Sequence, residues 1–319
     1  PTPTPRPTRT GFQPPDGQCY IGAWRDGILT YDALGSFVGD IKAKAGKGVF
    51  ILGIWSLFDY PYQNPVDRLK AAESLYRDGI IGGYALGWSP WSPGVATREN
   101  DALTITRIAN GYYDNYLRSI AKGLKEYVTA PFFIVLGGEM NGHWNGYGFD
   151  ASIYIKAWRR VHDIFREVGV KAEWVFQSNN QPSGSYPQSF LNRRPWKDYY
   201  PGDAYVDWIG VSWHSHSLWA MYPEKTIDEL FNDGEYLKFA IEHNKPFMFS
   251  ETGTDQYWAP EHDAPVSYQV QFINQIFDFM NRNNRVKAFI WYDLPYVIQN
   301  PDQLNAYLQG IANPRYISK

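Results

Sequence analysis

The sequence predicts a single (β/α)8 TIM barrel, and two observations carry this prediction. From residue 18 onward, short β-branched or aromatic segments alternate with longer amphipathic segments, as parallel strands do with their crossover helices. Neither an internal repeat nor a mid-chain linker divides the 319 residues, a length that one barrel domain routinely reaches. An open, doubly wound sheet is the alternative, but no glycine-rich phosphate turn follows the first expected strand.

The expected elements follow one another in regular order. Strands are predicted at residues 19–24, 49–55, 82–86, 132–137, 173–178, 206–212, 246–250 and 287–292. Amphipathic periodicity predicts helices at 31–46, 65–78, 103–127, 150–168, 225–243 and 266–282, with a weaker one at 301–311. Residues 179–205 are rich in Pro, Gly, Asn and Ser, so we expect at most a short helix there, at 195–199.

Composition excludes several classes of protein. Hydrophobic residues make up 44% of the chain and charged residues 20%, which is ordinary for a globular protein with a sizeable core. A net charge of −3 gives no reason to expect nucleic acid or a membrane surface as partner. No apolar run approaches the roughly 18 residues that span a bilayer. Cys19 is the single cysteine, so no intramolecular disulfide can form.

Aromatic residues are unusually frequent, at 17% of the chain with 13 tryptophans. A core does not need so many tryptophans. Most of them lie at or just beyond the C-terminal ends of expected strands: Trp24, Trp55, Trp88, Trp91, Trp144, Trp213, Trp219, Trp258 and Trp291. In a barrel these ends share one face, which carries the active site. Flat indole rings there suit the apolar faces of sugar rings.

Two carboxylates occupy the same kind of position. Glu139 follows the fourth expected strand and Glu251 follows the seventh. A pair of carboxyls flanking the substrate is the minimum equipment for cleaving a glycosidic bond, and about 5 Å between them suits a retaining reaction. A loop salt bridge is the alternative for either residue alone. Asp59 and Asp293, near other strand ends, are competing carboxylates.

The sequence segments around these two residues are similar to motifs of a known family. Residues 132–144, FFIVLGGEMNGHW, and residues 250–253, SETG, resemble the acid/base motif and the nucleophile strand of glycoside hydrolase family 26 of clan A. Residues 200–210 resemble the approach to its sixth strand, and 288–292, AFIWY, its eighth. The resemblance implies a retaining enzyme without a cofactor, in which Glu139 is the general acid/base and Glu251 the nucleophile. It also implies that Trp291 faces the barrel axis and floors the sugar at the cleavage point.

Other residues near the strand ends are expected to contact the substrate. They are Trp88, Asn141, His143, Trp144, Trp213, His214 and Trp258. His214 and His216 are two residues apart on an extended segment, but no third metal ligand is evident, so we expect no metal site.

One departure from the family pattern bears on the substrate. Mannan-cleaving members usually carry His immediately before the acid/base Glu, and here that position is Gly138. We expect an endo-β-glycanase, with β-1,4-mannan slightly ahead of mixed-linkage β-1,3/1,4-glucan (a lichenase). A non-catalytic carbohydrate-binding barrel would explain the tryptophans but not the two carboxylates.

The beginning of the chain has a different character. Residues 1–15 are dominated by Pro and Thr, which disfavour both helix and packed sheet. We interpret residues 1–17 as a linker and residues 18–319 as the catalytic barrel. Such linkers join the modules of secreted enzymes, so we expect an extracellular monomer, acting on a polysaccharide and tethered to further modules. A terminus without a partner domain is the alternative.

Overall fold

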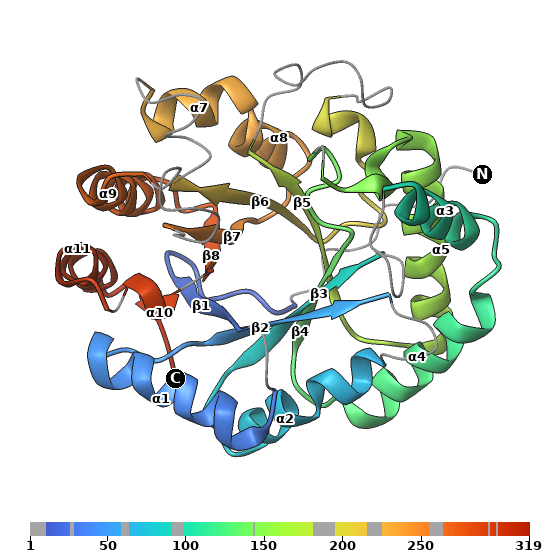
Figure 1. The fold of residues 1–319 in the computed structure, drawn as a ribbon, viewed down its shortest axis with the longest axis horizontal. Helices are drawn as coiled ribbons and strands as arrows, with labels where there is room; N and C mark the ends of the chain where they lie inside the picture. Colours follow the sequence, from blue (N-terminus) through green and yellow to red (C-terminus); the bar gives the residue numbers. More distant parts are fainter. Residues whose placement is uncertain are drawn as a thin grey trace.

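The computed structural model describes residues 11–25, 29–58, 64–90, 98–142, 144–180, 195–215, 225–254, 264–292, 294–297 and 299–319. Eight parallel strands form one sheet in the order β2-β3-β4-β5-β6-β7-β8-β1, and pairing of β1 with β2 closes the barrel. Helices surround the strands (Figure 1). The expected TIM barrel and its eight strands are confirmed. The strands are β1 (Cys19–Arg25), β2 (Ile51–Leu57), β3 (Gly83–Ser89), β4 (Phe132–Leu136), β5 (Glu173–Asn179), β6 (Trp208–His214), β7 (Phe247–Gly253) and β8 (Val286–Trp291). A short β9 (Tyr316–Ile317) pairs with the start of β1.

The outer layer follows the expected order with two differences. The helices are α1 (Tyr31–Ala45), α2 (Pro65–Arg77), α3 (Arg98–Ala109), α4 (Asp114–Tyr127), α5 (Ala151–Val168), α7 (Ile227–Gly234), α8 (Tyr236–Glu242), α9 (Val266–Arg282), α10 (Leu294–Val297) and α11 (Pro301–Ile311), with 3-10 turns η1 (Gly146–Gly148) and η2 (Trp196–Tyr199). The expected helix 103–127 is two helices, because Gly111 takes a φ of 83° between α3 and α4. The expected helix 225–243 likewise divides at Glu235, whose φ is 54°. Left-handed backbone ends a helix, and amphipathic periodicity does not reveal it.

Side chains on the strands alternate between two apolar layers. One set packs between the sheet and the helices, and the other fills the barrel interior. Phe12 belongs to the interior set, with its ring centroid 4.7 Å from that of Phe133. A Cβ on Gly83 would lie 2.4 Å from the Phe12 ring, so that strand position has room only for glycine. Within residues 1–17, Phe12 is therefore packed as part of the barrel. No helix in the described ranges is both long and apolar enough to cross a membrane.

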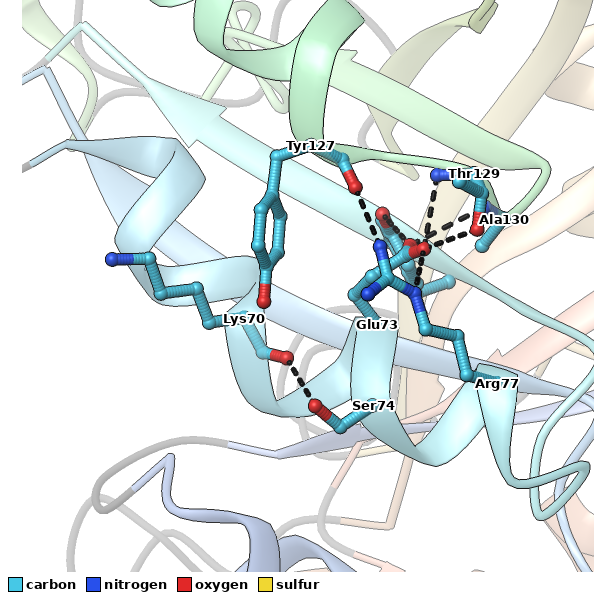
Figure 2. A network of polar contacts seen from close by, with 8 residues as sticks. Lys70, Glu73, Ser74, Arg77, Tyr127, Thr129 and Ala130 are labelled. Carbon is cyan, nitrogen blue, oxygen red and sulfur yellow. Dashed lines mark hydrogen bonds and ion pairs between the residues drawn. The ribbon is translucent and has the colours of Figure 1, made fainter.

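A buried carboxylate, Glu73 of α2, joins three elements on the helix side of the barrel (Figure 2). It accepts hydrogen bonds from the backbone N–H groups of Thr129 and Ala130, at 2.9 and 3.3 Å, just before β4. The hydroxyl of Tyr84, on β3, donates to it at 3.1 Å, and Arg77 Nε lies 3.2 Å away. These partners lie at the N-terminal ends of the strands, where residues contribute to stability.

We expect Glu73→Ala to lower the free energy of unfolding by about 3–5 kcal/mol, since it leaves several buried donors without an acceptor. Chemical denaturation measures this loss. Glu126→Ala removes an exposed carboxylate from the neighbouring α4 and serves as the matched control. Similar midpoints for the two variants would contradict a structural role for the Glu73 network.

Candidate active site

Glu139 lies in a tight turn immediately after β4. Gly137 and Glu139 both have positive φ, 53° and 56°, and for a non-glycine residue this conformation costs about 1–3 kcal/mol. Neighbouring hydrogen bonds hold the turn: Glu139 N–H donates to the Gln177 carbonyl at 3.1 Å, and Asn145 Nδ2 donates to the Glu139 carbonyl at 2.9 Å. The strained backbone therefore fixes the direction of the Glu139 side chain.

Both oxygens of the Glu139 carboxylate accept hydrogen bonds from neutral donors. Trp144 Nε1 donates to Oε2 at 3.0 Å, and Asn179 Nδ2 donates to Oε1 at 2.8 Å. Asn141 in turn fixes Asn179, accepting from its N–H at 2.7 Å and donating to its carbonyl at 3.1 Å. Of the contacts predicted from the sequence, Trp144 therefore lies on Glu139, and Asn141 supports it through Asn179.

Tyr147 supports the same turn through its hydroxyl group. Its hydroxyl donates to the Gly138 carbonyl. Burial, followed by the negative charge of Glu139, raises the pKa of Tyr147 well above its ordinary value. The phenol therefore stays protonated and remains a donor throughout the ordinary pH range.

Glu251 faces the barrel mouth because β7 contains one extra residue. Val211 of β6 pairs with Phe249, yet the next residue, Ser212, pairs with Glu251, so Ser250 has no counterpart. Regular alternation would place Glu251 on the side of Phe249, which packs in the outer layer. A register shift of one residue reverses the face on which a side chain lies.

Inward-facing side chains of β5 and β6 contact the Glu251 carboxylate. His214 Nε2 lies 3.4 Å from Oε1, and Gln177 Nε2 donates to Oε2 at 3.5 Å. The carboxylate is only 13% exposed, and the His214 side chain 9%. His214, expected from the sequence as a substrate contact, is therefore a neighbour of Glu251.

Gln177 contacts both candidate residues, the backbone of Glu139 and the carboxylate of Glu251. Its backbone carbonyl accepts from Glu139, and its side-chain amide donates to Glu251. Residues from β4 and β7, far apart in the sequence, thus meet across one residue of β5. Glutamine at a strand end gives a weak signal in sequence, and its position next to both carboxylates becomes visible only in the folded barrel.

The expectation that Trp88, Trp213 and Trp291 line the mouth is wrong. All three are fully buried in the outer layer between strands and helices. Trp291 packs against Tyr307 of α11, with ring centroids 5.4 Å apart, and Trp213 stacks on Phe231 of α7 at 4.9 Å. Each lies on the outward-facing side of its strand, and on β6 and β8 the next residue, His214 or Tyr292, faces inward instead.

Two other tryptophans occupy the interior near the mouth. Trp24 and Trp55 stack with centroids 4.5 Å apart, above strand positions that have no side chain. A Cβ on Gly53 would lie 2.3 Å from the Trp24 ring, and one on Gly87 would lie 2.2 Å from Trp55. Trp24 Nε1 also donates to the Ser250 carbonyl at 2.9 Å, which fixes the extra residue beside Glu251. In the sequence, the signal for this arrangement is Gly53, which lies two residues before Trp55 on the same face of β2 and leaves room for an indole ring.

Several residues predicted from the sequence to lie at the mouth fall outside the described residues. They are Trp91, His143, Trp219 and Trp258, together with the competing carboxylates Asp59 and Asp293. In the described ranges no three His, Cys, Asp or Glu side chains come close enough together to hold a metal ion. Burial raises the pKa of the Cys19 thiol to about 12, so this thiol is not a nucleophile at ordinary pH.

Comparison with known proteins places the fold among barrel structures. A scan against protein-family models and a search of curated proteins found no match. Similar solved structures include GH26A from Muricauda sp. MAR_2010_75, with 18% identity, coverage of 95% of this chain and 92% of that one, and a TM-score of 0.64. The catalytic domain of a GH26 endo-β-1,4-mannanase from Bacillus sp. JAMB-750 has 18% identity, 94% and 87% coverage, and a TM-score of 0.67.

A third similar structure is a β-mannanase from a symbiotic protist of the termite Reticulitermes speratus, complexed with a gluco-manno-oligosaccharide. It has 18% identity, covers 95% of this chain and 89% of that one, and has a TM-score of 0.61. At such identities the likeness establishes a shared fold. The chemistry has to be argued from the residues at the mouth.

Because Trp291 packs in the outer layer, we expect Trp291→Ala to lower the free energy of unfolding by about 3–5 kcal/mol. Trp144→Ala is the matched control, since the Trp144 side chain is 36% exposed and should cost far less. Thermal and denaturant unfolding compare the two. A Trp291→Ala variant as stable as the control would contradict the packing of Trp291 in the outer layer.

Proposed function

We propose that this chain is a retaining glycoside hydrolase that cleaves a β-linked polysaccharide internally. The observation that carries the proposal is the pair of carboxylates at the barrel mouth, that of Glu139 bonded by Trp144 and Asn179 and that of Glu251 by Gln177. Two carboxyls with separate supports at this end of a barrel are what double displacement at a sugar carbon requires. Two of the similar structures are named as mannanases, which supports the same chemistry.

The two carboxyls have different roles in the proposed reaction. The Glu251 carboxylate attacks the anomeric carbon while the glycosidic C–O bond breaks, and the leaving oxygen takes the proton of Glu139. Glu139, now ionised, removes a proton from water, and the water oxygen attacks the anomeric carbon. The bond to Glu251 breaks and both carboxyls return to their starting states. Trp144 and Asn179, which donate to Glu139, orient it for both transfers.

The proposed substrate is a plant-type polysaccharide, with β-1,4-mannan slightly favoured over mixed-linkage β-1,3/1,4-glucan. Mannan is supported by the names of the similar structures. Mixed-linkage glucan is supported by Gly138, which has no side chain to offer at the cleavage point. Trp55, partly exposed at the mouth, replaces Trp291 as the proposed aromatic contact.

A polysaccharide panel tests this function. Release of reducing sugars from one of the two polymers supports the proposal, and short oligosaccharide products support internal cleavage. Binding without any release would favour the non-catalytic barrel. Since a polymer cannot enter a cell intact, the proposal extends to an extracellular monomer that is tethered through the chain segment before Phe12.

We expect Glu251→Ala to abolish turnover of all glycans with the fold intact, because no other group supplies the nucleophile. With an activated aryl β-glycoside, added azide should attack the vacated face and give an α-configured glycosyl azide, identified by NMR. Glu242→Ala, which removes an exposed carboxylate from α8, is the control and should keep wild-type activity. Substantial activity of purified Glu251→Ala would refute the assignment.

Glu139→Ala should affect substrates according to their leaving groups. Hydrolysis of the polysaccharide needs a proton on the leaving oxygen and should fall by roughly two to four orders of magnitude, whereas an activated aryl glycoside departs without one. The glycosyl-enzyme then accumulates, and azide should release it as a β-configured product. Kinetics on both substrates measure the difference, and equal losses without an azide effect would exclude Glu139 as the acid/base.

A further inference from the structure

Gln177 has a position that the reaction steps above do not use. It lies on β5 between the two carboxylates, and its side chain is fully buried. We propose that Gln177 is a positioning residue for the nucleophile: its amide holds one oxygen of Glu251 and favours the ionised carboxylate. This inference rests on the proposed function, because it assigns the role through Glu251.

The amide is oriented to donate to Glu251, and such a bond is stronger to an ionised carboxylate than to a neutral carboxyl. Nε2 points to Glu251 Oε2 at 3.5 Å, and among the described residues no donor reaches the buried Oε1. The opposite orientation would place the amide oxygen against the carboxylate, where two acceptors repel each other. The present orientation leaves Gln177 Oε1 without a donor among the described residues, so the contact of Nε2 with Glu251 determines how the amide is oriented.

Gly138 provides the space that this arrangement needs. A Cβ at Gly138 would lie 1.9 Å from Gln177 Oε1, closer than any real contact. The Gly138 backbone has little freedom to move away, because Tyr147 and Asn145 both donate to its carbonyl. A side chain at Gly138 and the present position of the Gln177 amide therefore exclude each other.

The groups around Glu251 determine in which direction its pKa should change when the amide is lost. Among the described elements packed around it, His214 of β6 lies 3.4 Å away, and Tyr292, after β8, has its ring 5.9 Å from the His214 ring. Glu139 is a nearby acidic residue among those described, and its backbone N–H donates to the Gln177 carbonyl. Loss of the amide removes a donor that stabilises the charged form of Glu251, so the pKa of Glu251 should rise.

The first test keeps the volume of the side chain and removes the donor. Gln177→Met should lower kcat about ten- to hundredfold with a smaller change in KM, as expected for loss of a hydrogen bond to a charged group. The acidic limb of the kcat/KM profile should move up by roughly one pH unit. A purely structural role would not move that limb. Gln269→Met, at another buried glutamine on α9, is the matched control and should leave the limb unchanged.

The second test displaces the same amide by adding a methyl group at Gly138. Gly138→Ala should move the acidic limb in the same direction, because the added methyl displaces Gln177. In a Gln177→Ala background the room is restored, so adding Gly138→Ala should change kcat by less than about threefold. This cycle also decides the matter if Gln177→Met does not fold.

Three outcomes separate this inference from the function on which it rests. A shifted acidic limb in both single variants, with non-additive kcat losses, supports the positioning role. An active wild-type enzyme whose Gln177→Met and Gly138→Ala variants keep their acidic limb and kcat would overturn the role of Gln177 alone. A wild-type chain that cleaves no glycoside would overturn the proposed function, and this role with it.

Discussion

The candidate site depends on a single extra residue in β7. Ser250 has no counterpart on β6, and for that reason Glu251 lies on the interior side of the barrel, beside His214 and Gln177. A strand without this irregularity would bury the carboxylate among the aromatic rings behind the sheet, at a high desolvation cost. The hydrogen bond from Trp24 to the Ser250 carbonyl holds the irregularity in place. An irregularity of this kind is a built feature, often found beside active sites.

The two carboxylates are fixed by different means. Glu139 depends on a strained turn whose backbone is held by Asn145 and Gln177, and its oxygens accept from two neutral donors in the described ranges, Trp144 and Asn179. Glu251 depends on strand register, and its partners in the described ranges include an imidazole and an amide. Unlike environments for two carboxyls are what separate acid and nucleophile roles require. Gln177 is the one described residue that belongs to both supports.

The sequence predicted the barrel, the order of its strands and the strand ends that carry Glu139 and Glu251. These features depend on local composition and on the shared direction of parallel strands. It did not predict the faces of Trp88, Trp213 and Trp291, because alternation has a period of two and an error of one residue reverses the side. The breaks at Gly111 and Glu235 were missed for a related reason, since a single left-handed residue leaves helical periodicity intact. Neighbours such as Gln177 are set by tertiary contacts alone.

The stacked pair of Trp24 and Trp55 gives the barrel interior two unlike halves. At the C-terminal ends of β1–β3, indole rings rest on bare glycine backbone, whereas at the same ends of β4–β7 the described inward groups include carboxylates, amides and an imidazole. A pyranose is itself two-sided, with patches of C–H bonds and a rim of hydroxyls. In the proposed reaction, a mouth divided in this way favours one orientation of such a ring before any bond is broken. In that proposal, the aromatic half positions the ring, and the polar half then meets its hydroxyl groups in a fixed register.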